Sequence, residues 1–237
     1  MPSQALSAPV HVLKRRARIL SRARSIPLHA ALDEIAAQEG YRAWSLLAAR
    51  AAHPATPAEI RARLKPGELL LIGARPMQGK TAFALRLAAE AMKAGNRAFL
   101  FSLEYAARDV PDTFRRLGEE PAQFGDRLRV DCSDDIAAPH IVDTLASAGS
   151  GDLAVIDYLQ LLDRKRDAPL LEEQVRALRD FARTRGVTTA FLSQIDRGYD
   201  PTTKPMPDLS DVRLSNPLDL ALFDRAVFLQ GGKVKFG

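Results

Sequence analysis

A short loop rich in groups that bind phosphate is the part of this 237-residue sequence with the clearest chemistry. Gly79-Lys80-Thr81 follows the apolar run Leu69–Ile72 and precedes a helix-forming segment, Ala82–Glu90. A strand, a tight loop and a helix in this order turn backbone N–H groups and a helix N-terminus towards phosphates. We expect Lys80 to reach the β- and γ-phosphates of a nucleotide and the Thr81 hydroxyl to ligate magnesium. A chance Gly-Lys-Thr turn is the alternative.

The loop differs at one position from the general pattern G-x-x-x-x-G-K-[ST], because Ala74 stands where the pattern has its first glycine. The residues expected to surround the nucleotide are Ala74, Arg75, Pro76, Met77, Gln78, Gly79, Lys80, Thr81 and Ala82.

Hydrolysis of a phosphoanhydride also needs a carboxylate for the metal and a group that orients water. Asp157 ends an apolar strand, at the edge where open α/β sheets bind ligands, and we interpret it as holding magnesium through water. A surface aspartate at the end of a strand is the alternative. Glu104 follows another strand, where it is a candidate general base or a helix N-terminal charge. Gln194 ends a third strand, where its amide can sense the γ-phosphate.

Apolar strands alternating with helices must position these groups. A helix with apolar residues at helical spacing is predicted over residues 171–185. The alternation predicts an α/β fold with a mostly parallel sheet and crossover helices. The predicted strands are 69–72, 97–102, 152–157, 188–193 and 226–229.

The N-terminal part has a different character. Three short helices are expected there, and the first carries a basic run for which a solvated face and nucleic-acid contact are equal alternatives. This segment is similar to a small helical module found before unrelated domains in bacterial proteins, through Ala30–Leu32, Ile35–Ala36 and Gly40–Trp44. The predicted division is a flexible tail over 1–10, a basic helical module over 11–52, a linker over 53–63 and the main domain over 64–237.

Composition limits the classes of protein that fit. The net charge of +5 modestly favours polyanionic partners. The apolar runs are too short to span a bilayer. Cys132 is the only cysteine, and the N-terminus lacks the apolar core of a secretory signal. We therefore expect a cytoplasmic protein with no membrane partner.

The ordered motifs resemble those of DnaB-like replicative helicases over about residues 64 to 230. The segment from Ala74 to Thr81 is similar to that family's phosphate loop, including the alanine in place of glycine. Further resemblances lie in Phe101–Glu104, Ile156–Leu161, Leu192–Arg197 and Pro205–Asp211. The resemblance implies a RecA-like fold, ATP with Mg²⁺, and base and sensor roles for Glu104 and Gln194.

The same resemblance implies single-stranded DNA held by loops in the channel of a hexameric ring. Basic residues suit such loops because they neutralise the DNA backbone, although solvated loop charge is the alternative. The candidate residues are Arg164, Lys165, Arg166, Arg197 and Lys204.

Two departures from the family favour a second hypothesis. The basic module stands where the family has a large N-terminal domain, and Lys233 and Lys235 lie near the position of a Lys-x-Arg strand whose arginine reaches a neighbouring subunit's ATP. Lysine does not reproduce the planar fork of arginine. We therefore weigh two hypotheses. The first is a DnaB-like DNA helicase or ATPase that couples MgATP hydrolysis to single-stranded DNA binding, as a homo-oligomer or with a partner protein. The second is a nucleotide-dependent regulatory or DNA- or protein-binding module with little or no hydrolysis and no processive unwinding.

Overall fold

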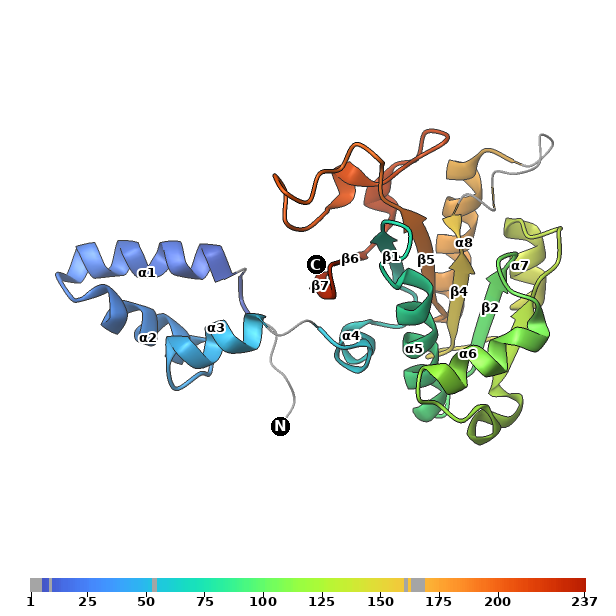
Figure 1. Ribbon diagram of the computed structural model, residues 1–237, viewed down its shortest axis with the longest axis horizontal. Helices are drawn as coiled ribbons and strands as arrows, with labels where there is room; N and C mark the ends of the chain where they lie inside the picture. Colours follow the sequence, from blue (N-terminus) through green and yellow to red (C-terminus); the bar gives the residue numbers. More distant parts are fainter. Residues whose placement is uncertain (1–5, 9, 53–54, 160–161, 163–168) are drawn as a thin grey trace. The chain divides into compact units, whose positions relative to one another are not determined.

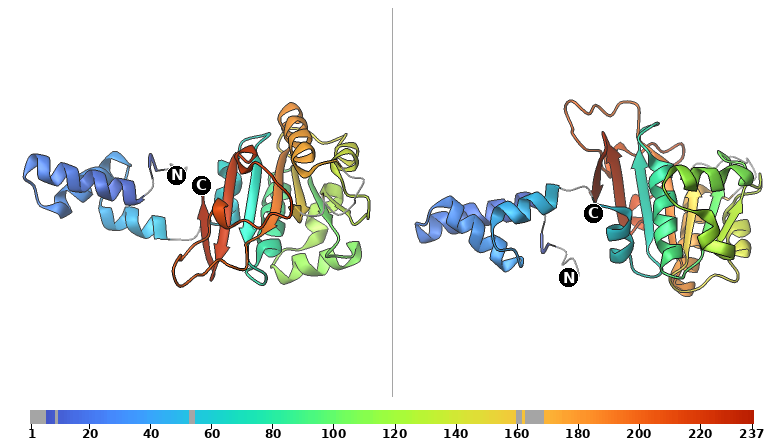
Figure 2. Two further views of the ribbon diagram at one scale, coloured as in Figure 1. Left: turned by 90° about the horizontal axis from the view of Figure 1, so that it is seen from above. Right: turned by 60° about the horizontal axis from the view of Figure 1, so that its bottom comes forward.

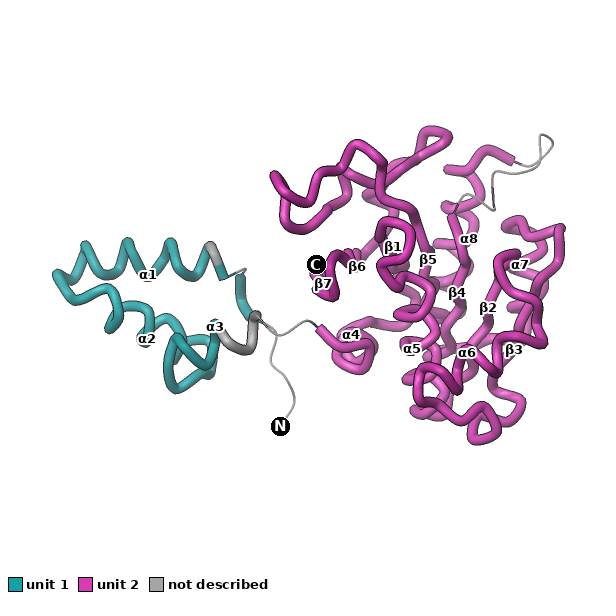
Figure 3. Tube along the Cα trace, viewed as in Figure 1, with its two compact units in different colours: residues 1–54 teal, residues 55–237 magenta. Residues whose placement is uncertain are grey.

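The computed structural model describes the chain except residues 1–5, 9, 53–54, 160–161 and 163–168. It divides into two compact units, residues 1–54 and 55–237, which are coloured separately in Figure 3. Figure 1 shows the helices of the first unit and the central sheet of the second.

The first unit is helical, as the spacing of its apolar residues predicts. Its helices are α1 (Val10–Arg24), α2 (Leu28–Gln38) and α3 (Trp44–Ala52). They enclose a small core of their own, made of Leu13, Ala17, Ala31, Ile35, Ala36 and Leu47.

The second unit is built on a seven-stranded sheet with the order β3-β2-β4-β5-β1-β6-β7. Every neighbouring pair is parallel except β6 and β7, which form an antiparallel hairpin. The mostly parallel α/β fold expected from the sequence is confirmed. The strands are β1 (Leu69–Ala74), β2 (Ala98–Ser102), β3 (Leu128–Asp131), β4 (Leu153–Asp157), β5 (Thr188–Gln194), β6 (Arg225–Gln230) and β7 (Lys233–Phe236).

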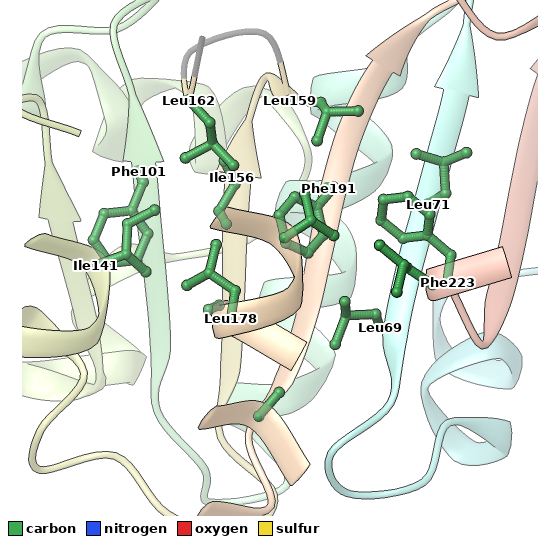
Figure 4. Packing of buried hydrophobic residues seen from close by; sticks show 14 of the residues in the cluster. Leu69, Leu71, Phe101, Ile141, Ile156, Leu159, Leu162, Leu178, Phe191 and Phe223 are labelled. Carbon is green, nitrogen blue, oxygen red and sulfur yellow. The ribbon is translucent and has the colours of Figure 1, made fainter. Parts of the chain in front are cut away.

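Helices cover both faces of this sheet (Figure 2). One face packs on α4, α5 and α6, and the other packs on α7 and α8. Figure 4 shows the second face, where Phe101, Ile156 and Phe191 of the central strands lie against helix residues such as Leu178. The helices are α4 (Pro57–Arg63), α5 (Lys80–Lys93), α6 (Val110–Arg116), α7 (Ala138–Thr144) and α8 (Leu171–Arg185), with short 3-10 turns η1 (Ala107–Asp109), η2 (Pro121–Arg127), η4 (Leu209–Asp211) and η5 (Leu220–Leu222).

Residues 57–63, which we expected to belong to a linker, form α4. Thr56 and Glu59 form a reciprocal capping box at its start, and such a cap is worth about 1 kcal/mol. Ile60 is fully buried in the core that α5 covers. A seven-residue helix has too few turns to show periodicity, so its capping box was the available sequence signal. Strands β3 and β7 were also not predicted.

Two aspartates tie the strands together at the amino edge of the sheet. Asp224 accepts a hydrogen bond from the Leu69 amide, where β1 begins, and pairs with Arg183 of α8. Asp152, just before β4, accepts from both the amide and the guanidinium of Arg97. Asp224 therefore ties the start of β1 to α8, and Asp152 ties the start of β2 to that of β4.

Within the described residues, no helix combines the length and the apolar character that crossing a membrane requires.

Candidate ATPase site

Four strands end at one edge of the sheet with their last residues on the same face. Val155 of β4 belongs to the core under α5, so Asp157, two residues later, projects from that face. Ser102 at the end of β2 pairs with Asp157, and Ala74 at the end of β1 pairs with Gln194 of β5. The register therefore gathers the predicted site residues on the side of the sheet from which α5 begins.

The loop between β1 and α5 has the left-handed backbone that a phosphate loop uses. Gly79 is the N-cap residue of α5 with φ of +81°, and Met77 has φ of +65° and a fully exposed side chain. A Cβ at Gly79 would meet no atom within 4 Å, so the backbone conformation rather than space favours glycine there. The N-terminus of α5, whose first turn carries no acidic residue, is left open to an anion.

Three predicted groups meet at the end of β4. The Lys80 ammonium lies 3.4 Å from Oδ1 of Asp157, and the Thr81 hydroxyl donates to Oδ2 of Asp157 over 3.0 Å. Asp157 is fully buried, and a buried carboxylate is costly without such partners. Hydroxyl and carboxylate oxygens are ligands that Mg²⁺ prefers, so Thr81 and Asp157 fit a magnesium ion, and Lys80 fits the phosphates that accompany it.

Glu104 lies beside this cluster, in the bend after β2. Its backbone amide donates to the Ser102 hydroxyl over 3.1 Å, which fixes the turn that carries it. Burial, followed by the negative charge of Asp157, raises the pKa of Glu104, and Lys80 opposes the shift. Glu104 precedes η1 by three residues, so it does not lie in a helical first turn. An exposed carboxylate whose pKa is raised in this way is suited to accept a proton.

Comparison with known proteins places this geometry in a family. Residues 59–122 and 127–221, well over half of the chain, match the family described as the DnaB-like helicase C terminal domain. This chain belongs to that family.

Curated relatives of the DnaB-like family are less than one third identical to the chain over the aligned residues. The replicative DNA helicase DnaB of Leifsonia xyli is 29% identical over 68% of this chain and 42% of its own length. The replicative DNA helicase DnaB of Geobacillus stearothermophilus is 28% identical over 64% of this chain and 40% of its own length. The chain thus spans about two fifths of the length of these relatives.

Solved structures of DnaB-like proteins share the fold. The ATPase domain of G40P matches with a TM-score of 0.59 and 20% identity, over 78% of this chain and 79% of that chain. A DnaB-like replicative helicase, described together with its interactions with primase, matches with a TM-score of 0.60 and 18% identity, over 96% of this chain and 72% of that one. The RecA-like fold expected from the resemblance is confirmed.

The predicted sensor Gln194 lies at the same edge as the phosphate loop. It is half-buried, and its carbonyl oxygen accepts a hydrogen bond from the Arg213 amide over 2.8 Å. Ile195 then forms an isolated bridge with Val212. The loop between these residues is therefore held at both ends next to the site, although its sensor role stays a prediction.

The predicted DNA contacts lie in different surroundings. Arg197 is exposed in the loop after β5. The Lys204 ammonium pairs with Asp211 at 2.5 Å and with Asp208 at 2.9 Å, so a DNA phosphate would have to compete with two carboxylates there. Bonds from the Ser210 hydroxyl and then from Lys204 lower the pKa of Asp208 to about 2. The other candidates, Arg164, Lys165 and Arg166, lie outside the described residues.

Sequence reasoning missed a contact between the phosphate loop and the β6–β7 turn. The Gln78 side chain accepts a hydrogen bond from the Gly231 amide over 2.8 Å. Gly231 and Gly232 both have positive φ, which shapes the tight turn that brings this amide to the loop. Both glycines lie beyond residue 221, where the family match ends. The Gly-Gly pair between apolar segments was the only sequence signal for this hairpin.

Two tyrosines also border the site without having been predicted there. Burial, with the charges of Asp157 and Glu104, raises the pKa of Tyr105. The Lys80 ammonium lies 5.9 Å from the centre of the Tyr158 ring. Both tyrosines directly follow a predicted acidic residue, which is the signal that could have identified them.

Proposed function

We propose that this chain binds ATP with magnesium at the loop of residues 74–82 and hydrolyses it with Glu104 as general base. The observation that carries the proposal is the convergence of Lys80, Thr81 and the buried Asp157 at the start of α5. Membership of the DnaB-like family supports the choice of ATP.

Each residue has a role that follows from its surroundings. Bound magnesium supplies positive charge to the phosphoryl group being transferred. Thr81, and Asp157 through water, would hold that ion, and Lys80 would exchange its contact with Asp157 for contacts with phosphate oxygens. Glu104 accepts a proton from the attacking water at its carboxylate, which its raised pKa favours. Gln194 senses the γ-phosphate from the end of β5.

We further propose that hydrolysis is coupled to single-stranded DNA in a DnaB-like manner, in the cytoplasm and within a homo-oligomer or with a partner protein. Arg197 in the exposed loop after β5, together with Lys204 and Arg164–Arg166, is the proposed contact with the DNA backbone. The relatives named as replicative DNA helicases support this extension. Because the chain spans about two fifths of the length of these relatives, DNA unwinding stays part of the proposal.

Nucleotide binding and hydrolysis of four purified proteins test the assignment. Lys80→Ala removes the phosphate contact and should abolish binding of a fluorescent ATP analogue. Glu104→Gln keeps the size of the side chain and should bind the analogue within about threefold of wild type. It should hydrolyse ATP at least about 100-fold more slowly, because a general base contributes about 10² to 10⁴ in rate. The matched control is Asp109→Asn, which alters an exposed carboxylate nearby and should change neither quantity.

The same proteins decide between the two hypotheses. Stimulation of wild-type hydrolysis by single-stranded DNA, with a larger species in sedimentation when ATP is present, supports the DNA-coupled ATPase. Binding of the analogue without turnover supports the regulatory module. A wild-type protein that binds no nucleotide, or a Glu104→Gln protein as active as wild type, would overturn the assignment.

A further inference from the structure

The net positive charge of the chain resides in the first compact unit. Residues 1–54 contain eight Lys and Arg and three Asp and Glu, whereas residues 55–237 contain 26 of each. The unit with the proposed ATP site is therefore neutral overall, and the total of +5 belongs to the small helical unit. An uncompensated charge on so small a unit favours a polyanionic partner.

Within that unit the charge is concentrated on α1. The helix Val10–Arg24 has six basic residues and no acidic one. Its inner face is apolar, because Leu13 and Ala17 are buried against α2 and α3. The six basic side chains are exposed, namely those of Lys14, Arg15, Arg16, Arg18, Arg22 and Arg24.

Two of these charges have a carboxylate near them inside the unit. Arg24 forms an ion pair of 2.6 Å with Glu34. Arg16 contributes to lowering the pKa of Glu39, after the bonds from Ser7. For the other four basic residues, the described part of the chain provides no carboxylate within ion-pair distance.

Three of these four form a stripe along the helix. Arg15, Arg18 and Arg22 follow the spacing i, i+3, i+7, which lines one face. The rise from the first to the last is about 10 Å, close to three base steps of a nucleic-acid strand. Arginine also binds phosphate oxygens in pairs through its planar fork.

We propose that the α1 stripe, defined as Arg15, Arg18 and Arg22 with Lys14 beside them, binds the phosphate backbone of nucleic acid without needing ATP. It is separate from the DNA loops proposed for the ATPase unit and does not depend on the ATP site. The chemistry shared by single strands and duplexes is the phosphate, so both are tested.

The experiment uses the full chain without nucleotide and labelled 30-mer oligonucleotides, one single-stranded and one duplex, at several salt concentrations. Neutralising the stripe with Arg15→Gln, Arg18→Gln and Arg22→Gln should weaken binding about tenfold or more at low salt. The slope of log affinity against log salt should fall by about 2 to 3, because each lost phosphate contact removes about 0.7 to 0.9 from it. The arms with the two oligonucleotides show which form of nucleic acid is preferred.

Three controls separate the stripe from other causes. The first control removes the same charge from exposed sites of the ATPase unit, through Arg86→Gln, Arg108→Gln and Arg129→Gln. Its affinity should stay within about twofold of wild type, because we attribute binding to the stripe and not to the net charge of the chain. The variant with Arg15→Lys, Arg18→Lys and Arg22→Lys keeps the charge and should retain most of the wild-type affinity. A thermal melt of each variant establishes that the protein is folded.

The outcomes are decisive in both directions. Equal binding by wild type and the glutamine stripe variant, or an equal loss in the ATPase-unit control, would refute the stripe. Binding to vesicles with phosphatidylserine but to neither oligonucleotide would also refute it. Lys80→Ala should bind the oligonucleotides like wild type without nucleotide, so failure of the ATP site and failure of the stripe are distinguished.

Discussion

Replacing Gly73 by alanine tests how the strand before the phosphate loop packs. Gly73 is the fifth residue of β1, and an added Cβ would lie 2.8 and 2.9 Å from two ring carbons of Phe228 and 3.2 Å from Cδ1 of Ile195. The Phe228 ring is 4% exposed and belongs to the core on the α8 side of the sheet. Carbon atoms pack best about 3.5 to 4.0 Å apart, so the ring or the strand must move by about 1 Å.

The expected cost follows from this overlap. Adding a methyl group to a filled core costs about 1 to 3 kcal/mol. In a domain of this size each kcal/mol lowers the melting temperature by about 2 to 4 °C. We therefore expect Gly73→Ala to melt about 2 to 12 °C below wild type. Affinity for ATP should fall as well, because Ala74, where the loop begins, moves with the strand.

Urea unfolding and thermal melting of four variants measure this effect. Phe228→Leu shortens the obstructing side chain, so the double variant should lose at least about 1 kcal/mol less than the sum of the two single variants. Gly149→Ala is the matched control, because a Cβ there meets no atom within 4 Å. It should stay within about 0.5 kcal/mol of wild type.

Two results would refute the reasoning. An unchanged melting temperature for Gly73→Ala would mean that the sheet absorbs the added methyl group without cost. Additive losses in the double variant would mean that Phe228 is not the obstacle.

Four further outcomes are expected. Gln78→Ala removes the tie to the β6–β7 turn and should raise the Kd for a fluorescent ATP analogue about fivefold, the equivalent of one hydrogen bond of about 1 kcal/mol; an unchanged Kd would contradict this. Because burial and Asp157 raise the pKa of Glu104, the acid limb of the pH–rate profile for hydrolysis should have its midpoint above the ordinary glutamate value of about 4.3, and a lower midpoint would remove Glu104 from that role. The pKa of Asp208 is lowered to about 2, so the stability that its carboxylate contributes is complete above about pH 4 and is lost as the pH falls towards 2. Asp208→Asn should therefore reduce the urea midpoint at pH 5 but hardly at pH 2. Equal losses at both pH values would contradict the assignment. Thr56→Ala should lower the free energy of unfolding in urea by about 1 kcal/mol, because α4 loses its cap. An unchanged free energy would mean that the capping bond contributes nothing.

Much of the sheet was predictable from local pattern. The central strands are buried on both faces, so their sequences are continuous apolar runs, and these runs predicted β1, β2, β4, β5 and β6. Strand β3 lies at one edge and is only partly buried, with Arg129 exposed, so it has no such run. Strand β7 alternates exposed lysines with partly buried Val234 and Phe236, a four-residue pattern too short to be distinctive.

The sequence alone determined the chemical identity of the candidate site. Lys80, Thr81, Asp157 and Glu104 were named from motifs, because each is defined by its position at the end of a strand or in the segment that follows it, and that position is a local property. The contact of Lys80 and Thr81 with Asp157 agrees with the roles proposed for them.

The tertiary structure decided which groups meet across distant segments. Gln78 and Gly231 are far apart in the chain, and their contact exists because β6 lies next to β1 and the hairpin turn ends beside the phosphate loop. The same neighbourhood places Phe228 against Gly73. Which of the basic residues of α1 remain uncompensated also depends on the fold, since α2 provides the carboxylate that pairs with Arg24. Residue types and local spacing are written along the chain, whereas strand order and register are set by packing of the whole core.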